Sequence, residues 1–194
     1  MIYPEFLKEN DLIGVTAPSA GLDESHLVGY LKSLEHFHAR GWQVTETANV
    51  RLPEMPSSSG AQRARELKGL SQDSRVKMIW CAAGGDFLVE MLPDTDFASL
   101  RANPKWLQGY SDPTGLLFPL TTKYDVATIY GPNAGGFDME KLHPALENSL
   151  DILSGNIPVQ RSFERWQPFD APSRPDGGYN LLYPVHWQTP CGPV

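Results

Sequence analysis

The sequence GYSDP, residues 109–113, places a serine between an apolar run and a segment with helical character. It is similar to a nucleophile elbow, the sharp turn between a strand and a helix that exposes a serine hydroxyl above the sheet. The match is partial, because the G-x-S-x-G pattern requires glycine where this chain has Pro113. The chemistry that this pattern would support is attack by the hydroxyl of Ser111 on a carbonyl carbon.

The same residues also have a purely structural interpretation. Serine and aspartate are among the best helix N-caps, so Ser111 or Asp112 could do no more than cap the following helix. With Asp112 as the cap, Pro113 would occupy the first helical position, where its missing N–H costs nothing. In the catalytic interpretation, the N–H of Asp112 at the helix start could face a developing oxyanion. Local chemistry leaves both interpretations open.

A second candidate is the sequence AAGGDF, residues 82–87, which follows another apolar run. Paired glycines let backbone N–H groups approach a ligand closely, because no Cβ intervenes and a positive φ is accessible. Gly84 and Gly85 could therefore form half of an oxyanion hole, and Gly84 and Asp86 are our candidate substrate-binding residues. An ordinary turn between a strand and a helix also favours glycine and remains the alternative.

The other reactive side chains have simpler interpretations. Cys81 and Cys191 are too few for a disulfide framework, and Cys81 ends an apolar run, where a small buried thiol is common. Asp94 and Asp96 lie in a loop-like segment, where capping explains them. We expect each of the five histidines to be solvated or locally hydrogen-bonded rather than the base for Ser111. The sequence has no H-E-x-x-H motif and no Cys/His cluster, so we expect no metal site.

Strand and helix signals alternate along the chain and must position these candidates. Short apolar runs predict strands at residues 12–17, 43–47, 76–82, 106–110 and 126–130. Between them, an apolar stripe predicts one helix on Leu27, Tyr30, Leu31 and Leu34, and Ser59 with Gln62 forms a capping box for another. This order predicts an α/β fold, a mostly parallel sheet with helices on both faces. Ligands bind at the carboxyl ends of such strands, where both candidate loops would lie.

Composition narrows the class of protein. The chain has 194 residues, 41% of them hydrophobic, enough to bury a core. Its net charge is −7 and its basic residues are scattered, which argues against nucleic-acid or anionic-membrane partners. No basic start precedes a long apolar run, and no window approaches the length of a membrane span. We therefore expect a cytoplasmic protein that acts on small molecules or peptides.

Four segments carry a family resemblance: VTAPSA, RARELKGLSQDSRVKMIWCAAGGDFLVEMLP, PKWLQGYSDPTGLL and IYGPN. In this order and spacing they resemble the N-terminal domain of the LD-carboxypeptidase family of serine peptidases, which includes the microcin C immunity-type peptidases. The similarity covers about residues 10–194, and the tail is more like the microcin-immunity branch. The resemblance implies a flavodoxin-like sheet, a Ser-His-Glu triad, a homodimer and no cofactor. Ser111 matches the nucleophile, and the N–H groups of Gly85 and Asp112 match the oxyanion donors.

The sequence departs from the family pattern at its end. In the family the triad Glu and His lie in a C-terminal domain, whereas this sequence stops at Val194. We therefore expect both to be missing and the chain as given to be nearly inactive, because a serine without its base is a weak nucleophile. Residues 168–194 hold six prolines and the turn signal DGG. We predict a nucleophile-bearing domain at residues 1–155, and at 156–194 an irregular inter-domain segment with the start of a truncated C-terminal domain.

The leading hypothesis is a serine peptidase or amide hydrolase acting on a small peptide or an aminoacyl-nucleotide-like substrate. The scissile amide would lie next to a small or D-configured residue. The alternative is a non-catalytic peptide- or nucleotide-binding domain that has lost the triad. A third and weaker hypothesis is an amidotransferase-like or flavin-binding domain on a similar sheet. The lack of cysteine at the elbow argues against the amidotransferase.

Overall fold

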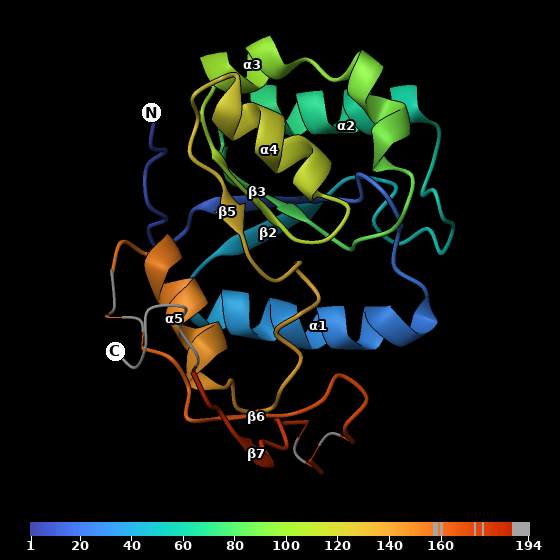
Figure 1. Ribbon diagram of the computed structural model, residues 1–194. Coiled ribbons are helices and arrows are strands. Elements are labelled where there is room, and N and C mark those ends of the chain that lie inside the picture. The colour runs from blue at the N-terminus through green and yellow to red at the C-terminus, as the bar shows by residue number, and fades with distance from the viewer. Residues whose placement is uncertain (157–158, 160, 173, 176, 188–194) are drawn as a thin grey trace.

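The computed structural model describes residues 1–156, 159, 161–172, 174–175 and 177–187 (Figure 1). Its main sheet has five strands in the order β2-β1-β3-β4-β5, and all of their pairings are parallel. The strands are β1 Leu12–Thr16, β2 Gln43–Glu46, β3 Val76–Cys81, β4 Trp106–Gly109 and β5 Ile129–Tyr130. This is the strand order of flavodoxin-like sheets, so the predicted fold class is confirmed.

Helices cover both faces of the sheet (Figure 1). One side carries α1 Glu24–Ala39 and α5 Pro144–Leu153. The other carries α2 Gly60–Gln72, α3 Phe97–Ala102, α4 Thr114–Thr122 and the 3₁₀ helix η1 Leu88–Asp94. In the central strand β3, Met78 and Trp80 belong to the core beneath α1, whereas Ile79 and Cys81 belong to the core beneath α2. Strand side chains alternate between faces, so a continuous apolar run fills both cores.

The first helix is present as predicted, but its buried face differs. Asp23 caps α1 by accepting a hydrogen bond from the N–H of His26, at 2.9 Å. The buried positions are Tyr30, Ser33 and Phe37, and the ring of Phe37 stacks on Trp80 with centroids 4.6 Å apart. Leu31, a member of the apolar stripe that predicted the helix, is 43% exposed, so the stripe does not coincide with the buried face. Adjacent helical positions are about 100° apart, so Tyr30 faces the sheet and Leu31 faces away.

The structure also tests the predicted start of the second helix and the predicted fifth strand. Ser59 caps α2 and accepts from the N–H of Gln62 at 3.3 Å, which confirms the predicted helix start. The fifth strand is shorter than predicted, because Val126 pairs only with Ile2 in an isolated parallel bridge. The chain therefore reaches the sheet edge at residue 126 but joins β4 only from Ile129 onward.

The C-terminal part of the described chain lies apart from the main sheet. Strand β6, Arg165–Trp166, pairs antiparallel with β7, Tyr183–Pro184, beyond the α1 side of the molecule (Figure 1). Cys191 and the last two of the six tail prolines lie outside the described residues. The domain boundary at residue 155 stays a prediction. Among the described residues, no helix has the length and apolar character that a bilayer crossing requires.

Candidate active site

Three loops meet at the carboxyl ends of neighbouring strands. They follow β1, β3 and β4, and they carry Ser19, Gly84–Gly85 and Ser111–Asp112. The N–H of Ala20 donates to the carbonyl of Gly84 at 3.0 Å, which joins the first loop to the second. A Cβ on Gly84 would stand 3.3 Å from Oγ of Ser111, which places the second loop against the third. The fold thus brings together the two loops that the sequence singles out.

Ser111 has the backbone conformation of an elbow. Its φ is +65°, in the left-handed region that residues with a Cβ rarely adopt. The residue is exposed, and no described residue forms a hydrogen bond with its Oγ. A strained turn that lifts a free serine hydroxyl above the sheet is the geometry of a nucleophile elbow.

Neither Ser111 nor Asp112 caps the helix with its side chain. The N-cap position of α4 is Pro113, and no side chain caps the helix there. Backbone carbonyls serve the first N–H groups instead: the carbonyl of Ser111 accepts from Thr114 at 3.0 Å, and that of Asp112 accepts from Gly115 at 2.9 Å. The capping interpretation is therefore wrong, and α4 begins one residue later than predicted.

The carboxylate of Asp112 binds two other loops. Its Oδ2 accepts hydrogen bonds from the hydroxyl of Ser19 and, at 2.9 Å, from the N–H of Leu88. Ser19 is fully buried, and its Oγ also accepts from the N–H of Phe87 at 3.3 Å. Ser19 lies in the loop after the first predicted strand, but its residue type alone gave no sign of this role.

The backbone conformation of the loop after β3 requires glycine at its second glycine position, Gly85. Gly85 has a φ of +144°, and a Cβ there would collide with Oγ of Ser19. Only glycine fits this conformation and this contact without strain. Gly84, the preceding residue, lies against Ser111, and its role in substrate binding stays a prediction. Asp86 is exposed at the surface, and its role in substrate binding stays a prediction.

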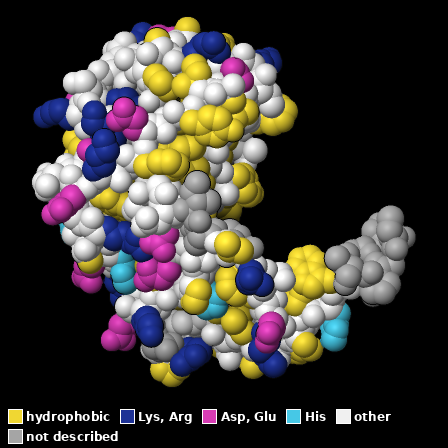
Figure 2. Space-filling model, turned by 90° about the vertical axis from the view of Figure 1, so that its left-hand side faces the viewer, with side chains coloured by type: hydrophobic (Ala, Val, Ile, Leu, Met, Phe, Trp, Pro, Cys, Tyr) yellow, Lys and Arg dark blue, Asp and Glu magenta, His cyan; other side chains and the backbone are white. Residues whose placement is uncertain are grey.

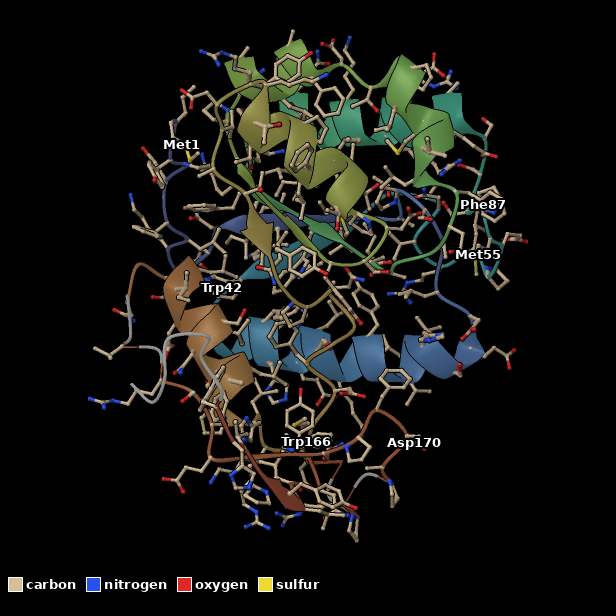
Figure 3. The ribbon with its side chains drawn as sticks, viewed as in Figure 1. Met1, Trp42, Met55, Phe87, Trp166 and Asp170 are labelled. Atoms are coloured by element: carbon tan, nitrogen blue, oxygen red, sulfur yellow. The ribbon has the colours of Figure 1, made fainter. Side chains whose placement is uncertain are left out.

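A buried arginine, Arg63, donates hydrogen bonds to the loops after β1 and β3. The side chain of Arg63, on α2, is 0% exposed. It donates to the carbonyls of Pro18 and Phe87 at 2.8 and 2.9 Å, and to the carboxylate of Glu90 at 2.8 Å. The ring of Phe87 lies at the surface (Figure 3), so only its backbone faces inward to Arg63 and Ser19. Sequence reasoning missed Arg63, because arginine in an amphipathic helix is usually solvated.

Asn133 closes the site on the side of β5. Its side chain is nearly buried, and its Oδ1 accepts from the N–H of Tyr110 at 3.1 Å. A Cβ on Gly109 would come within 3.1 Å of the same oxygen. Asn133 therefore holds the backbone that leads into Ser111.

Three of the histidines have hydrogen-bond partners other than Ser111, but the partner of His36 lies 103 positions along the chain rather than nearby. His26 contacts Asp23 and His36 contacts the carbonyl of Met139, both at 2.8 Å. His143 caps α5 by accepting from the N–H of Ala145 at 3.2 Å, and burial lowers its pKa. Burial raises the pKa of the Cys81 thiol to about 12. Within the described part of the chain, no group of three or more His, Cys, Asp or Glu side chains could hold a metal ion.

Two cavities flank Tyr110, the neighbour of Ser111. One, of about 390 Å³, is lined in part by Gly84, Lys32 and Asp138, and the other, of about 440 Å³, in part by Tyr130 and Tyr179. Figure 2 shows hydrophobic side chains gathered along a hollow on one side of the molecule. A cavity of about 590 Å³ lies at the amino ends of the strands, the end where such sheets do not bind ligands.

Comparisons with known proteins agree with this architecture. A putative carboxypeptidase of Treponema pallidum is 32% identical over 136 residues, which cover 70% of this chain and 40% of that protein. A crystal structure of an MccF-like protein from Bacillus anthracis has a TM-score of 0.74 and 30% identity over 79% of this chain and 47% of that chain.

The third relative is MccF, the microcin C7 self-immunity protein. The Escherichia coli protein is 29% identical over 127 residues, 65% of this chain and 37% of its own length. The structure of MccF in complex with glutamyl sulfamoyl guanosine has a TM-score of 0.76 over 94% of this chain and 56% of that chain. At 23% identity, this likeness shows the fold alone. The match to this chain spans about two fifths of the length of these two curated relatives.

The family itself is shown by the match to a family model. The LD-carboxypeptidase N-terminal domain matches residues 13–131, which is more than half of the chain. The matched range contains β2 to β5, β1 except for Leu12, and all three loops of the candidate site. The chain therefore belongs to the LD-carboxypeptidase family, through the N-terminal domain of that family.

Proposed function

We propose that this protein is a serine-type amide hydrolase of the LD-carboxypeptidase and microcin-immunity type. The observation that carries the proposal is the exposed, left-handed Ser111 standing against the Gly84–Gly85 loop. The hydroxyl of Ser111 would attack the scissile carbonyl carbon. The N–H groups of Gly85 and Asp112 would donate to the tetrahedral oxygen, where preorganised donors stabilise the developing charge.

The general base would come from outside the described residues. A serine hydroxyl needs a neighbouring base to take its proton, and no described histidine is hydrogen-bonded to Ser111. A Glu-His pair in the remainder of the family's architecture would supply that base and its orienting carboxylate. We therefore expect residues 1–194 alone to hydrolyse substrate only at the residual rate that an oxyanion hole and binding provide.

The substrate class is a small peptide or an aminoacyl-nucleotide-like molecule. The relative MccF has been solved with glutamyl sulfamoyl guanosine, in which an acyl group is joined to a nucleoside. The cavities on either side of Tyr110 would provide room for the two portions of such a molecule next to Ser111. A cytoplasmic location stays an expectation from the sequence composition, and the family likeness is the only support for a homodimer.

A second candidate function is ligand binding without catalysis. It is favoured by the same free Oγ of Ser111, which has no base among the described residues. This function predicts saturable binding of a peptide or nucleotide ligand with no turnover.

The test begins with sequencing of the gene past codon 194 and expression of the full-length protein. Hydrolysis of an L-amino acid–D-alanine peptide and of an aminoacyl sulfamoyl nucleoside is then compared for the wild type, Ser111→Ala and Ser74→Ala. Ser74 is an exposed serine at the opposite end of the sheet. We expect Ser111→Ala to lower kcat by about 10⁴-fold or more and Ser74→Ala to leave it unchanged. Equal hydrolysis by Ser111→Ala and the wild type would exclude Ser111 as the nucleophile.

A further inference from the structure

The side chain of Asp112 has an unusual set of partners for a residue at a helix start. Both of its hydrogen bonds go to Oδ2, from the hydroxyl of Ser19 and from the N–H of Leu88. Neither donor belongs to α4, whose first N–H groups bind backbone carbonyls instead. The carboxylate therefore contributes nothing to capping its own helix and connects the elbow to the loops after β1 and β3.

Ser19 is the second member of this connection. Its Oγ donates to Asp112 and accepts from the N–H of Phe87, so both roles of the hydroxyl are used. The residue is fully buried, and its own carbonyl accepts from the N–H of Ser57 at 2.8 Å. Ser19 is thus fixed by a hydrogen bond from Ser57, and its own hydroxyl fixes the loop after β3.

Gly85 lies between the attachment points of that loop. On one side, the carbonyl of Gly84 accepts from Ala20. On the other side, the N–H groups of Phe87 and Leu88 donate to Ser19 and Asp112. Glycine reaches a φ of +144° freely and is the least restricted residue, so the backbone of Gly85 does not fix the orientation of its N–H by itself and these attachments must do so.

We infer that the carboxylate of Asp112, acting through Ser19 and Leu88, is a positioning group that sets the separation of the two oxyanion donors. This inference rests on the proposed function. One residue would then supply a donor with its own N–H and orient the other donor, Gly85, with its side chain. Because a misplacement of about 1 Å can cost on the order of 100-fold in rate, such coupling would affect the chemical step more than substrate binding.

The two obvious substitutions of Asp112 separate geometry from charge. Asp112→Ala removes both hydrogen bonds and releases the loop. Asp112→Asn keeps one carbonyl oxygen, and a single oxygen can accept from both Ser19 and Leu88 because both donors now bind Oδ2. The asparagine also removes a negative charge near the developing oxyanion. We therefore expect Asp112→Asn to keep residues 84–88 as ordered as in the wild type and to lose less kcat than Asp112→Ala, which should behave like Ser19→Ala.

The experiment measures loop order and catalysis separately in the full-length protein. Amide hydrogen exchange of residues 84–88 and steady-state kinetics are recorded for the wild type, Ser19→Ala, Asp112→Ala and Asp112→Asn. The matched control is Asp96→Ala, because Asp96 also accepts from a backbone N–H and a side chain, those of Ser99 and Lys68, but at α3. We expect exchange in residues 84–88 to rise at least about 10-fold in Ser19→Ala and Asp112→Ala only. In these two variants kcat should fall about 100-fold with little change in KM.

Two results would contradict the positioning role of Asp112. Unchanged exchange of residues 84–88 in a folded Asp112→Ala protein would overturn it, whatever happens to kcat. A loss of kcat in Asp112→Asn equal to that in Asp112→Ala would also overturn it, because charge rather than geometry would then matter. If Asp112→Ala does not fold, Ser19→Ala carries the same test with a smaller change. Failure of the proposed function would appear separately, as hydrolysis that does not depend on Ser111.

Discussion

A Cβ on Gly84 would lie 3.3 Å from Oγ of Ser111, so the glycine loop and the elbow are almost in contact. The two residues follow neighbouring parallel strands, in which Trp80 is paired with Gln108. Since parallel strands end at the same edge of the sheet, short exits from β3 and β4 must meet there. A change in the conformation of the glycine loop should therefore alter the surroundings of Ser111.

Gly85→Ala should disturb the loop and the fold. The new Cβ would have to accept a φ of +144° and would collide with Oγ of Ser19, so we expect a loss of about 1–3 kcal/mol of stability and a fall in kcat. The matched control is Gly69→Ala on the exposed face of α2, where nothing lies within 4 Å of the new Cβ. That change should stabilise the protein by about 0.5–1 kcal/mol. Urea denaturation of both variants checks the opposite signs, and a shift in the same direction would contradict the loop geometry.

Arg63→Met should be among the more destabilising single substitutions. It leaves the carbonyl of Pro18 without its Arg63 donor, and an unsatisfied buried group costs about 1–3 kcal/mol. It also removes one of the two donors to the carbonyl of Phe87, which still accepts from the N–H of Glu90. Glu90 is half exposed and can be rehydrated, so its charge adds little to the loss. Arg75→Met is the control, because Arg75 is 79% exposed and pairs with Asp73 at the surface. Equal midpoints of denaturation for the two variants would show that burial of Arg63 is unimportant.

The thiol of Cys81 should be inert in the folded protein. Burial raises its pKa to about 12, so almost no thiolate is present at pH 8. In a Cys191→Ser background, we expect a disulfide reagent to modify Cys81 at least about 100-fold more slowly in native buffer than in guanidinium chloride. Rapid labelling without denaturant would contradict the buried position of Cys81 in β3.

The stability of the protein should depend on pH through His143. Burial lowers the pKa of His143 in the folded state below its ordinary value of 6.5, so the unfolded chain takes up the proton first. The stability that the neutral form of His143 contributes is fully present above pH 6.5, and it is lost as the pH falls toward the folded-state pKa. Protonation also removes the acceptor that Nδ1 offers to the N–H of Ala145.

His143→Asn isolates that contribution, because asparagine can still cap α5 but does not titrate in this range. Denaturation midpoints are compared at pH 7.5 and 5.5 for the wild type and the variant. The wild type should lose more stability than His143→Asn, since the carboxylates titrate in both proteins. Identical losses would mean that His143 is not held in its neutral form.

Local patterns in the sequence were sufficient for the elements and for the place of the elbow. Apolar runs located the strands, the Ser59 capping box located the start of α2, and the family motifs located Ser111 and the glycine loop. Each of these patterns lies within a short window of the sequence, so it can be read without knowing which distant residues pack together.

The connections between the loops required the tertiary structure. Ser19 and Asp112 are 93 positions apart, and they meet only because β1, β3 and β4 are adjacent in the sheet. The burial of Arg63 and the exposure of Leu31 were likewise not evident, since the orientation of a helix against the sheet is set by packing. Sequence by itself therefore determined which segments carry the candidate chemistry. Packing of the sheet decided which side chains support that chemistry, because hydrogen bonds between distant residues depend on strand order.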